Sequence, residues 1–285
     1  MIYTIKNDVL SVSVDDYGAE IKSVKIRGKE MIWQNPTGEW SSTSPVLFPV
    51  CGCCEITHKG VEYPVKFHGV ARRANFTLTD SGADFLRFTL QSSEETKLYY
   101  PFDFTLELIY RIAENTLFVE HHIQNDGNEP MYYAAGGHES YNLDADVSEY
   151  VIEFDEEEEL SHSLAGEGSR LSGEKVSLGK TKYLSLASKY LDGSGTFVYE
   201  GLKSRKIWLC KKDGERLVEL IIDKAFGNLL LWRAGNAKYI CIEPWMNMPD
   251  TESEEARKIE FSQKRGVQKV NVGERTVLYR SIQYK

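Results

Sequence analysis

Three short stretches of this sequence combine side chains that can move protons with residues that shape the backbone. His68 precedes a glycine in KFHGVARR, His138 follows a glycine pair in YYAAGGHESYNL, and Glu243 precedes a proline in YICIEPWMNMPD. Because free histidine and glutamate have pKa values of about 6.5 and about 4.3, one can donate a proton while the other accepts one near neutral pH. Such a pair could perform acid–base chemistry without a metal, a nucleotide or a covalent intermediate.

Opening of a sugar hemiacetal requires this kind of pair. A base removes the proton of the anomeric hydroxyl while an acid protonates the ring oxygen, and rotation about C1–C2 followed by closure gives the other anomer. Arg72 and Asn142 could hold sugar hydroxyls. The aromatic residues that could stack on the C–H faces of a sugar are Trp33, Trp40, Phe48, Tyr141 and Trp245.

Each of these residues also has a purely structural interpretation. A histidine beside glycines is often a satisfied strand residue, and a glutamate before proline often ends a strand. Aromatic side chains usually belong to the core. No single stretch therefore establishes a sugar site.

The stretch PVCGCCEITH raises the question of a metal site, because Cys51, Cys53 and Cys54 fall close together. Structural zinc sites use cysteines about two to four residues apart with a second pair well downstream. Adjacent Cys53 and Cys54 can hardly point at one ion from an extended chain. Cys210 and Cys241 stand alone in apolar segments, where a small buried thiol is usual. We therefore expect packing at this cluster, with no metal and no cofactor.

Composition excludes several classes of partner. The 285 residues carry a formal net charge of -9, which argues against binding to nucleic-acid phosphates. No apolar run approaches the about 20 residues that cross a bilayer, and the N-terminal segment lacks a signal-peptide pattern. Five cysteines are an odd, sparse set that suits reduced thiols. We expect a cytoplasmic monomer or homodimer without a nucleic-acid or membrane partner.

Alternation of apolar and polar residues predicts β-strands along most of the chain. In residues 104–126, alternate side chains from Leu106 to Ile112 share one face, Glu114–Asn115 turn the chain, and those from Leu117 to Ile123 face back. Similar runs recur at roughly 8–12 residue spacing, and no linker separates two halves. The expected fold is all-β, a large antiparallel β-sandwich forming a single domain over residues 1–285.

Two segments depart from this pattern. Residues 250–263, DTESEEARKIEFSQ, are the best candidate for a helix or loop. The acidic run EFDEEEEL at 153–160 and the Gly/Ser-rich HSLAGEGSRLSGEK at 162–175 are expected to form a solvated strand end and a loop.

At these residues the sequence resembles the aldose 1-epimerase (galactose mutarotase-like) family, and most of all its LacX-type branch. The matching pieces follow the family order and together cover nearly the whole chain. They are SPVLFPVCG at 44–52, HGVAR at 68–72, YPFDFTLELIYRI at 100–112, GGHESYN at 136–142, CIEPWMNMPD at 241–250 and RGVQKVNVGE at 265–274.

The resemblance implies a galactose mutarotase-like supersandwich with a concave face that binds sugar. His138 carries over as the general acid acting on the ring oxygen, and Glu243 as the general base at O1. His68 and Arg72 carry over as substrate-binding residues. From the residue types considered above, we add Asn142 and Trp245 to the expected substrate-binding residues. The function it implies is metal-independent interconversion of the α and β anomers of a free aldohexose.

The chain departs from the family pattern at several positions of the expected cleft. Relatives often have arginine where this chain has Ser42–Ser44 and Cys53, and glutamine where it has Phe67. Because arginine is the favoured bidentate partner of phosphate, these changes disfavour the alternative of a hexose-6-phosphate 1-epimerase. A second alternative is a non-catalytic carbohydrate-binding sandwich that uses the same cleft. Substitution of His138 or Glu243 would separate the two classes, since only an enzyme loses turnover.

Overall fold

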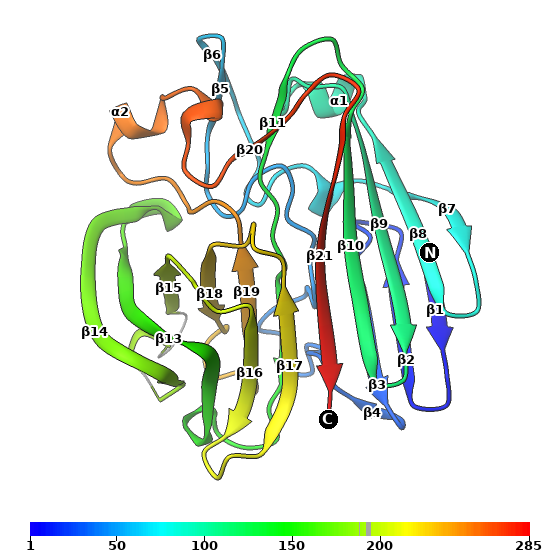
Figure 1. The fold of residues 1–285 in the computed structure, drawn as a ribbon, viewed down its shortest axis with the longest axis vertical. Coiled ribbons are helices and arrows are strands. Elements are labelled where there is room, and N and C mark those ends of the chain that lie inside the picture. Colours follow the sequence, from blue (N-terminus) through cyan, green and yellow to red (C-terminus); the bar gives the residue numbers. More distant parts are fainter. Residues whose placement is uncertain (188, 192–194) are drawn as a thin grey trace.

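The computed structural model describes residues 1–187, 189–191 and 195–285, which form an antiparallel β-sandwich (Figure 1). One layer is a nine-stranded sheet. Its strands, in order across the sheet, are β14 (Leu171–Ser185), β13 (Tyr150–Ala165), β16 (Lys206–Lys211), β17 (Arg216–Ile222), β21 (Arg275–Tyr284), β10 (Thr116–Asn125), β9 (Phe104–Ala113), β8 (Phe85–Gln91) and β7 (Thr77–Ser81).

Two four-stranded sheets form the opposite layer. The first contains β1 (Ile2–Lys6), β2 (Leu10–Asp15), β3 (Ile21–Ile26) and β4 (Lys29–Glu30), and the second, in spatial order, β12 (Glu139–Asn142), β19 (Tyr239–Trp245), β18 (Asn228–Trp232) and β15 (Thr196–Glu200). Contacts of β1 with β8, β2 with β9 and β13 with β15 join the layers. A bridge between Ile32 and Tyr141 links the two smaller sheets, so the second layer is nearly continuous.

The remaining elements are short. Two-stranded ladders pair β5 (Ile56–His58) with β6 (Val61–Tyr63) and β11 (Met131–Tyr133) with β20 (Gln268–Val270). The helices are α1 (Glu94–Lys97), α2 (Glu254–Arg257) and 3-10 turns at Ala71–Arg73, Val147–Glu149, Glu167–Ser169, Lys189–Leu191 and Phe261–Gln263. Helical turns thus occur within 250–263, as predicted. Within the ranges that the structure describes, no helix is long and apolar enough to span a membrane.

The predicted hairpin over residues 104–126 is confirmed. β9 and β10 pair around Glu114–Asn115, and Leu117 lies opposite Ile112. The alternate side chains from Leu106 to Ile112 and from Leu117 to Ile123 are buried, because the pleat turns one set of each strand toward the opposite layer. The expected all-β sandwich is the observed fold.

The prediction for residues 153–175 is wrong. The acidic run and most of the Gly/Ser-rich segment form the long hairpin β13–β14, and only residues 166–170 lie between the strands. Glu158 is fully buried, and its carboxylate accepts hydrogen bonds from Tyr199 Oη at 2.8 Å and the Ser204 backbone N–H at 2.7 Å. These distant partners offset the cost of burying a carboxylate, which a local charge pattern does not reveal.

The His121 imidazole in β10 is fully buried in the core, and neither ring nitrogen has a hydrogen-bond partner among the groups that the structure describes. Burial is the main reason that the pKa of His121 lies well below its usual range, and the nearby charges of Arg280 and His122 act in the same direction. In the unfolded chain this imidazole titrates at about 6.5. Its contribution to stability is therefore present above that pH and is lost as the pH falls toward the folded-state pKa.

Substitution of His121 by leucine or glutamine is expected to make stability less sensitive to acid. Each variant removes one proton taken up on unfolding, so the slope of unfolding free energy against pH should fall by about 1.4 kcal/mol per pH unit below pH 6.5. Urea unfolding at pH 7.5, 6.5 and 5.5 measures this slope. Leucine should also raise stability at pH 7.5 because it leaves no unpaired polar group. Equal slopes for wild type and both variants would contradict the assignment.

Candidate active site

A cleft of about 510 Å³ opens on the face of the β12-β19-β18-β15 sheet. Its floor consists of residues from β18 and β19, and its walls come from the segment 52–72, from β15 and from the tip of the β13–β14 hairpin. Because alternate residues of β19 point to opposite faces, Cys241, Glu243 and Trp245 lie on the cleft side while Ile242 faces the core. The strand runs on through Pro244 to Trp245.

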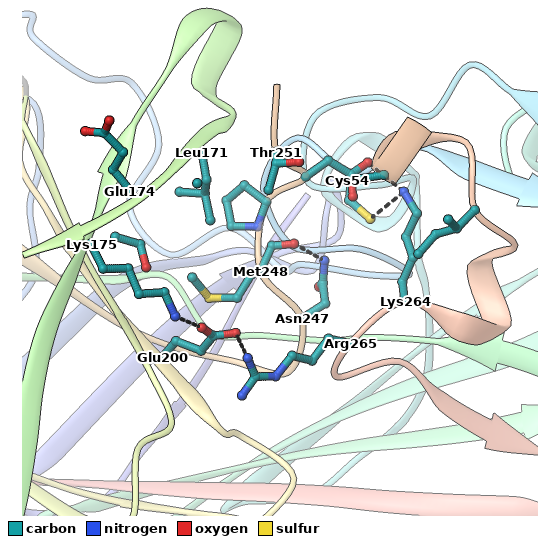
Figure 2. A pocket seen from close by; sticks show the side chains of 16 residues that line it. Cys54, Leu171, Glu174, Lys175, Glu200, Asn247, Met248, Thr251, Lys264 and Arg265 are labelled. Atoms are coloured by element: carbon teal, nitrogen blue, oxygen red, sulfur yellow. Dashed lines mark hydrogen bonds and ion pairs between the residues drawn. The ribbon is translucent and has the colours of Figure 1, made fainter. Parts of the chain in front are cut away.

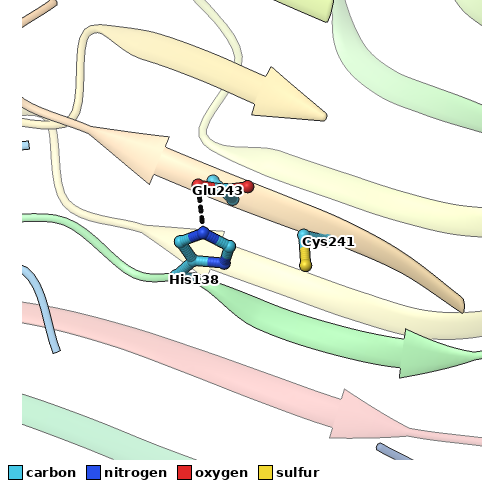
Figure 3. A group of neighbouring side chains, drawn as sticks. All are labelled: His138, Cys241 and Glu243. Carbon is cyan, nitrogen blue, oxygen red and sulfur yellow. Dashed lines mark ion pairs between the residues drawn. The ribbon is translucent and has the colours of Figure 1, made fainter. Parts of the chain in front are cut away.

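His138 and Glu243 meet at the floor of this cleft. His138 immediately precedes β12, whose first residue Glu139 pairs with Ile242, and this register places residue 138 beside residue 243. The distance from His138 Nε2 to Glu243 Oε2 is 3.3 Å, and the two residues are 6% and 2% exposed (Figure 3). The two side chains therefore contact each other within one cleft, His138 from the residue before β12 and Glu243 from β19.

The glycine pair before His138 serves close packing within the protein. A Cβ atom on Gly136 would lie 2.9 Å from both Cys51 Sγ and Trp245 Cδ1, and one on Gly137 would lie 2.9 Å from Arg280 Nε. Side chains at these positions would push apart the segments that carry the cleft. The glycine pair therefore allows a close approach of the backbone to neighbouring segments of the protein.

Burial shifts the pKa values of both partners. Loss of hydration lowers the pKa of His138 to about 3, and the positive charge of Arg72 acts in the same direction. Burial raises the pKa of Glu243 well above its usual range, to which the Glu139 carboxylate adds, while Trp245 and Arg72 oppose the rise. Since both shifts disfavour the charged forms, the pair carries no net charge at neutral pH. One exchangeable proton is thus available between the Oε2 and Nε2 atoms.

His68 lines the cleft in a strained conformation. Its φ of +65° is uncommon for a residue other than glycine. Gly69 follows with φ of +80°, and only glycine fits there because a Cβ would lie 2.2 Å from the Phe48 carbonyl oxygen. The Gly52 backbone N–H donates to His68 Nδ1 at 3.0 Å. Burial, followed by the effect of His138, holds the pKa of His68 well below its usual range. The ring is therefore neutral and carries its proton on Nε2.

The other predicted binding residues divide into two groups. Arg72 lines the cleft, where its Nη2 donates to Ser42 Oγ at 3.2 Å. Trp245 lines it with a buried indole beside Glu243. Asn142 does not line the cleft. Its amide donates to the Ile32 carbonyl oxygen at 2.7 Å and so holds β12 to the neighbouring sheet.

The sequence analysis did not name Trp232 or Arg170, and it named Trp40 only as an aromatic residue that could stack on a sugar. Trp40 stacks on His138 with ring centroids 5.1 Å apart, and Trp232 approaches the same ring edge-on at 6.0 Å. Trp232 shares the strand face of Leu230, so alternation in NLLLWR could have placed it. Arg170 also lines the cleft, but no local pattern distinguishes it, because it lies in the segment that we expected to be a solvated loop.

The remaining aromatic candidates are buried, as are four of the five cysteines, all but Cys53. Trp33 packs on Tyr239, and Phe48 and Tyr141 are fully buried. Cys51 packs in an apolar cluster that includes Trp245, which agrees with the packing role expected for the cysteine-rich stretch. Cys51 therefore supports the cleft by packing against side chains that line it.

A smaller cavity of about 280 Å³ shares a wall with the cleft (Figure 2). Glu200 binds both Lys175 and Arg265 there, and buried Lys264 pairs with Asp250 at 2.6 Å. Because each of these cations has a carboxylate partner within the protein, the cavity has a structural explanation, and we assign the chemistry to the cleft.

The fold and the cleft together define an antiparallel supersandwich protein with a buried imidazole–carboxylate pair beneath aromatic walls. The sequence model of the aldose 1-epimerase family matches residues 1–185, and the chain belongs to this family. The plasmid-encoded protein LacX of Lactococcus lactis subsp. lactis is 27% identical over 278 residues, which cover 91% of this chain and 92% of LacX.

Solved structures agree with this assignment. A galactose mutarotase related enzyme from Lactobacillus acidophilus superposes with a TM-score of 0.88 and 26% identity, covering 100% of this chain and 97% of that one. A galactose mutarotase-like protein from Lactobacillus casei ATCC 334 superposes over the full length of both chains with a TM-score of 0.91. Since its identity is 23%, it bears on the fold alone.

Proposed function

We propose that the protein is an aldose 1-epimerase that interconverts the α and β anomers of a free aldohexose by general acid–base catalysis. The observation that carries the proposal is the buried 3.3 Å contact between His138 Nε2 and Glu243 Oε2 at the cleft floor. The anomeric oxygen and the ring oxygen of a pyranose are bonded to the same carbon. A base and an acid that serve these two atoms must therefore be immediate neighbours.

The reaction leaves the protonation of the pair unchanged over one turnover. Ionised Glu243 takes the proton of the anomeric hydroxyl while protonated His138 gives its proton to the ring oxygen, and the bond between C1 and the ring oxygen breaks to leave the open-chain aldehyde. After rotation about C1–C2, closure runs the two transfers in reverse on the opposite face. Transfer of the shared proton across the 3.3 Å contact prepares this state from the neutral pair.

The cleft walls suit a sugar ring. Trp40, Trp232 and Trp245 present aromatic surface around His138 and Glu243, against which the C–H faces of a pyranose can pack. Donors for hydroxyl oxygens are the Nε2–H of His68 and the guanidinium of Arg72. These residues bind and orient the ring, whereas the pair at the floor transfers protons.

Polarimetry of freshly dissolved α-galactose and α-glucose tests the proposal. The rotation should reach equilibrium faster with the protein than without it, and EDTA should leave the rate unchanged because no proton transfer requires a metal. An unchanged rotation rate with every common aldose, together with saturable sugar binding, would contradict the proposal and favour a carbohydrate-binding protein. Inactivation by EDTA that added metal reverses would contradict the metal-independent mechanism.

One observation favours a second substrate class, sugars that carry an anionic group. Arg170 and Arg257 both pair with the single carboxylate of Glu55, at 2.8 and 3.2 Å, so this group carries a net positive charge at the cleft wall. Arginine in such a position can bind phosphate. Comparison of kcat/KM for glucose and glucose 6-phosphate in the same assay decides between a free aldohexose and a hexose 6-phosphate.

A further inference from the structure

We propose that the cleft also binds one thiophilic divalent cation, such as Zn²⁺, through His138, Cys241 and Glu243, and that this cation excludes the sugar. The inhibitory effect rests on the proposed function, whereas binding of the cation does not. The site uses none of the cysteines of the stretch at 51–54.

The geometry brings three different ligand types together. One ligand atom from each residue lies within 4.8 Å of the other two (Figure 3). Cys241 and Glu243 alternate along β19 and share its cleft face, and His138 is brought beside them by the register of β12. His138 Nδ1 has no hydrogen-bond partner in the described part of the chain, so no hydrogen bond at this atom holds the ring against a small rotation. Metal–ligand bonds of about 2.0–2.3 Å require only a modest contraction of this group.

The chemistry of the ligands selects the ion. Zinc sites with an exchangeable position use three protein ligands, drawn from imidazole, thiolate and carboxylate, and leave the fourth position open. Here that position faces the cleft, because His138 and Glu243 line it. Calcium takes six to eight oxygen ligands and magnesium a near-ideal octahedron, which this group does not offer. Zn²⁺, Co²⁺ and Cd²⁺ are therefore preferred.

Charge balance permits the ion to be buried. On binding, the Cys241 thiol and the Glu243 carboxyl release protons to solvent, and the two anionic ligands neutralise the dication. This balance matters because Arg72 lies near enough to act on both residues and opposes any additional positive charge. The bound complex adds no net charge to a site that already holds one guanidinium.

Occupancy by the ion is incompatible with turnover. A nitrogen of His138 and an oxygen of Glu243 that coordinate a metal cannot exchange protons with a sugar. The open coordination position also lies where the anomeric oxygen would bind. Added Zn²⁺ should thus compete with the sugar, while the metal-free enzyme remains the active form.

Titration with Co²⁺ tests binding without reference to activity. The wild type should take up one Co²⁺ per chain and develop the near-ultraviolet charge-transfer absorption of a cobalt–thiolate bond, which Zn²⁺ then abolishes. Cys241→Ser should lose this absorption. Cys53→Ser is the matched control and should retain it, since Cys53 is the one cysteine of the five that is not buried and is therefore the alternative ligand. A band retained by Cys241→Ser, or absent from the wild type, would overturn the proposal.

Inhibition of mutarotation supplies the second measurement. The Zn²⁺ concentration that halves each variant's own rate should be at least about tenfold higher for Cys241→Ser than for the wild type or Cys53→Ser. Cys241→Ala should behave as Cys241→Ser, and thermal unfolding establishes that both variants are folded. Equal inhibition of all variants would overturn the proposal. Cobalt binding by a protein that turns over no sugar would support the cation site and contradict the proposed function. Mutarotation by a protein that lacks the cobalt absorption would support the proposed function and contradict the cation site.

Discussion

Glu243→Gln and His138→Gln are each expected to lower kcat for mutarotation by about 10²–10⁴-fold. Glutamine retains hydrogen-bonding capacity at either position but exchanges no proton near neutral pH. The effect should appear in kcat more than in KM, because Arg72, His68 and the tryptophans that we propose bind the ring are unchanged. Stopped-flow polarimetry at saturating α-galactose measures it.

The double variant distinguishes a concerted pair from two independent groups. If Glu243 and His138 act in one proton-transfer step, the double variant should be about as slow as the slower single variant, because removal of either partner already abolishes that step. His122→Gln and Glu62→Gln, which lie outside the cleft, are matched controls and should retain the wild-type rate. Losses below about tenfold in kcat would contradict the assignment of His138 and Glu243 as the acid and base.

Arg280→Met is expected to destabilise the fold by about 3–5 kcal/mol. Arg280 lies in the core directly behind the cleft, where its Nε donates to Glu139 Oε1 at 3.1 Å, and the two side chains are 3% and 2% exposed. Ser44 Oγ also donates to this carboxylate, at 3.3 Å. Without the guanidinium, Glu139 would be a buried anion with one hydroxyl partner, a state that costs far more than the intact pair.

The double variant Glu139→Gln/Arg280→Met should recover most of this loss, because neither buried charge remains. Urea unfolding monitored by fluorescence gives the four free energies of the cycle. Arg111→Met on the exposed face of β9 is the control and should change stability by less than about 1 kcal/mol. A cost below about 1 kcal/mol for Arg280→Met alone would contradict the assignment of a buried, mutually dependent pair.

Local patterns predicted the parts of the fold that depend on local physics. Alternation around Glu114–Asn115 determines both the hairpin and its buried face, since the pleat has a period of two. The same rule fails for Glu158, whose burial depends on hydrogen-bond donors more than forty residues away. A run of charged residues indicates that the isolated segment would be solvated. It does not indicate which hydrogen-bond donors the folded chain places beside that segment.

In the candidate site, too, the sequence predicted what depends on local residues and missed what depends on distant ones. The sequence resemblance identified His138 and Glu243, and the register between β12 and β19 places them in contact. Asn142 lies in the strand that follows His138, but backbone carbonyls of the neighbouring sheet occupy its amide. Arg170 reaches the cleft only because the long hairpin folds back over it. Position along a strand was therefore predictable, whereas competition among distant hydrogen-bond partners was not.

The hairpin that forms one wall of the cleft is tied to the segment that follows β19. The backbone N–H of Leu171 donates to the Asp250 carbonyl oxygen at 2.9 Å, and that of Glu252 donates to Leu171 at the same distance. The hairpin and the segment that follows β19 are thus joined by backbone hydrogen bonds, to which the Glu252 carboxylate adds a hydrogen bond from the Glu167 backbone N–H. Under the proposed function, residues at the hairpin tip can therefore change and alter which sugar is bound while His138 and Glu243 on the sheet keep their positions.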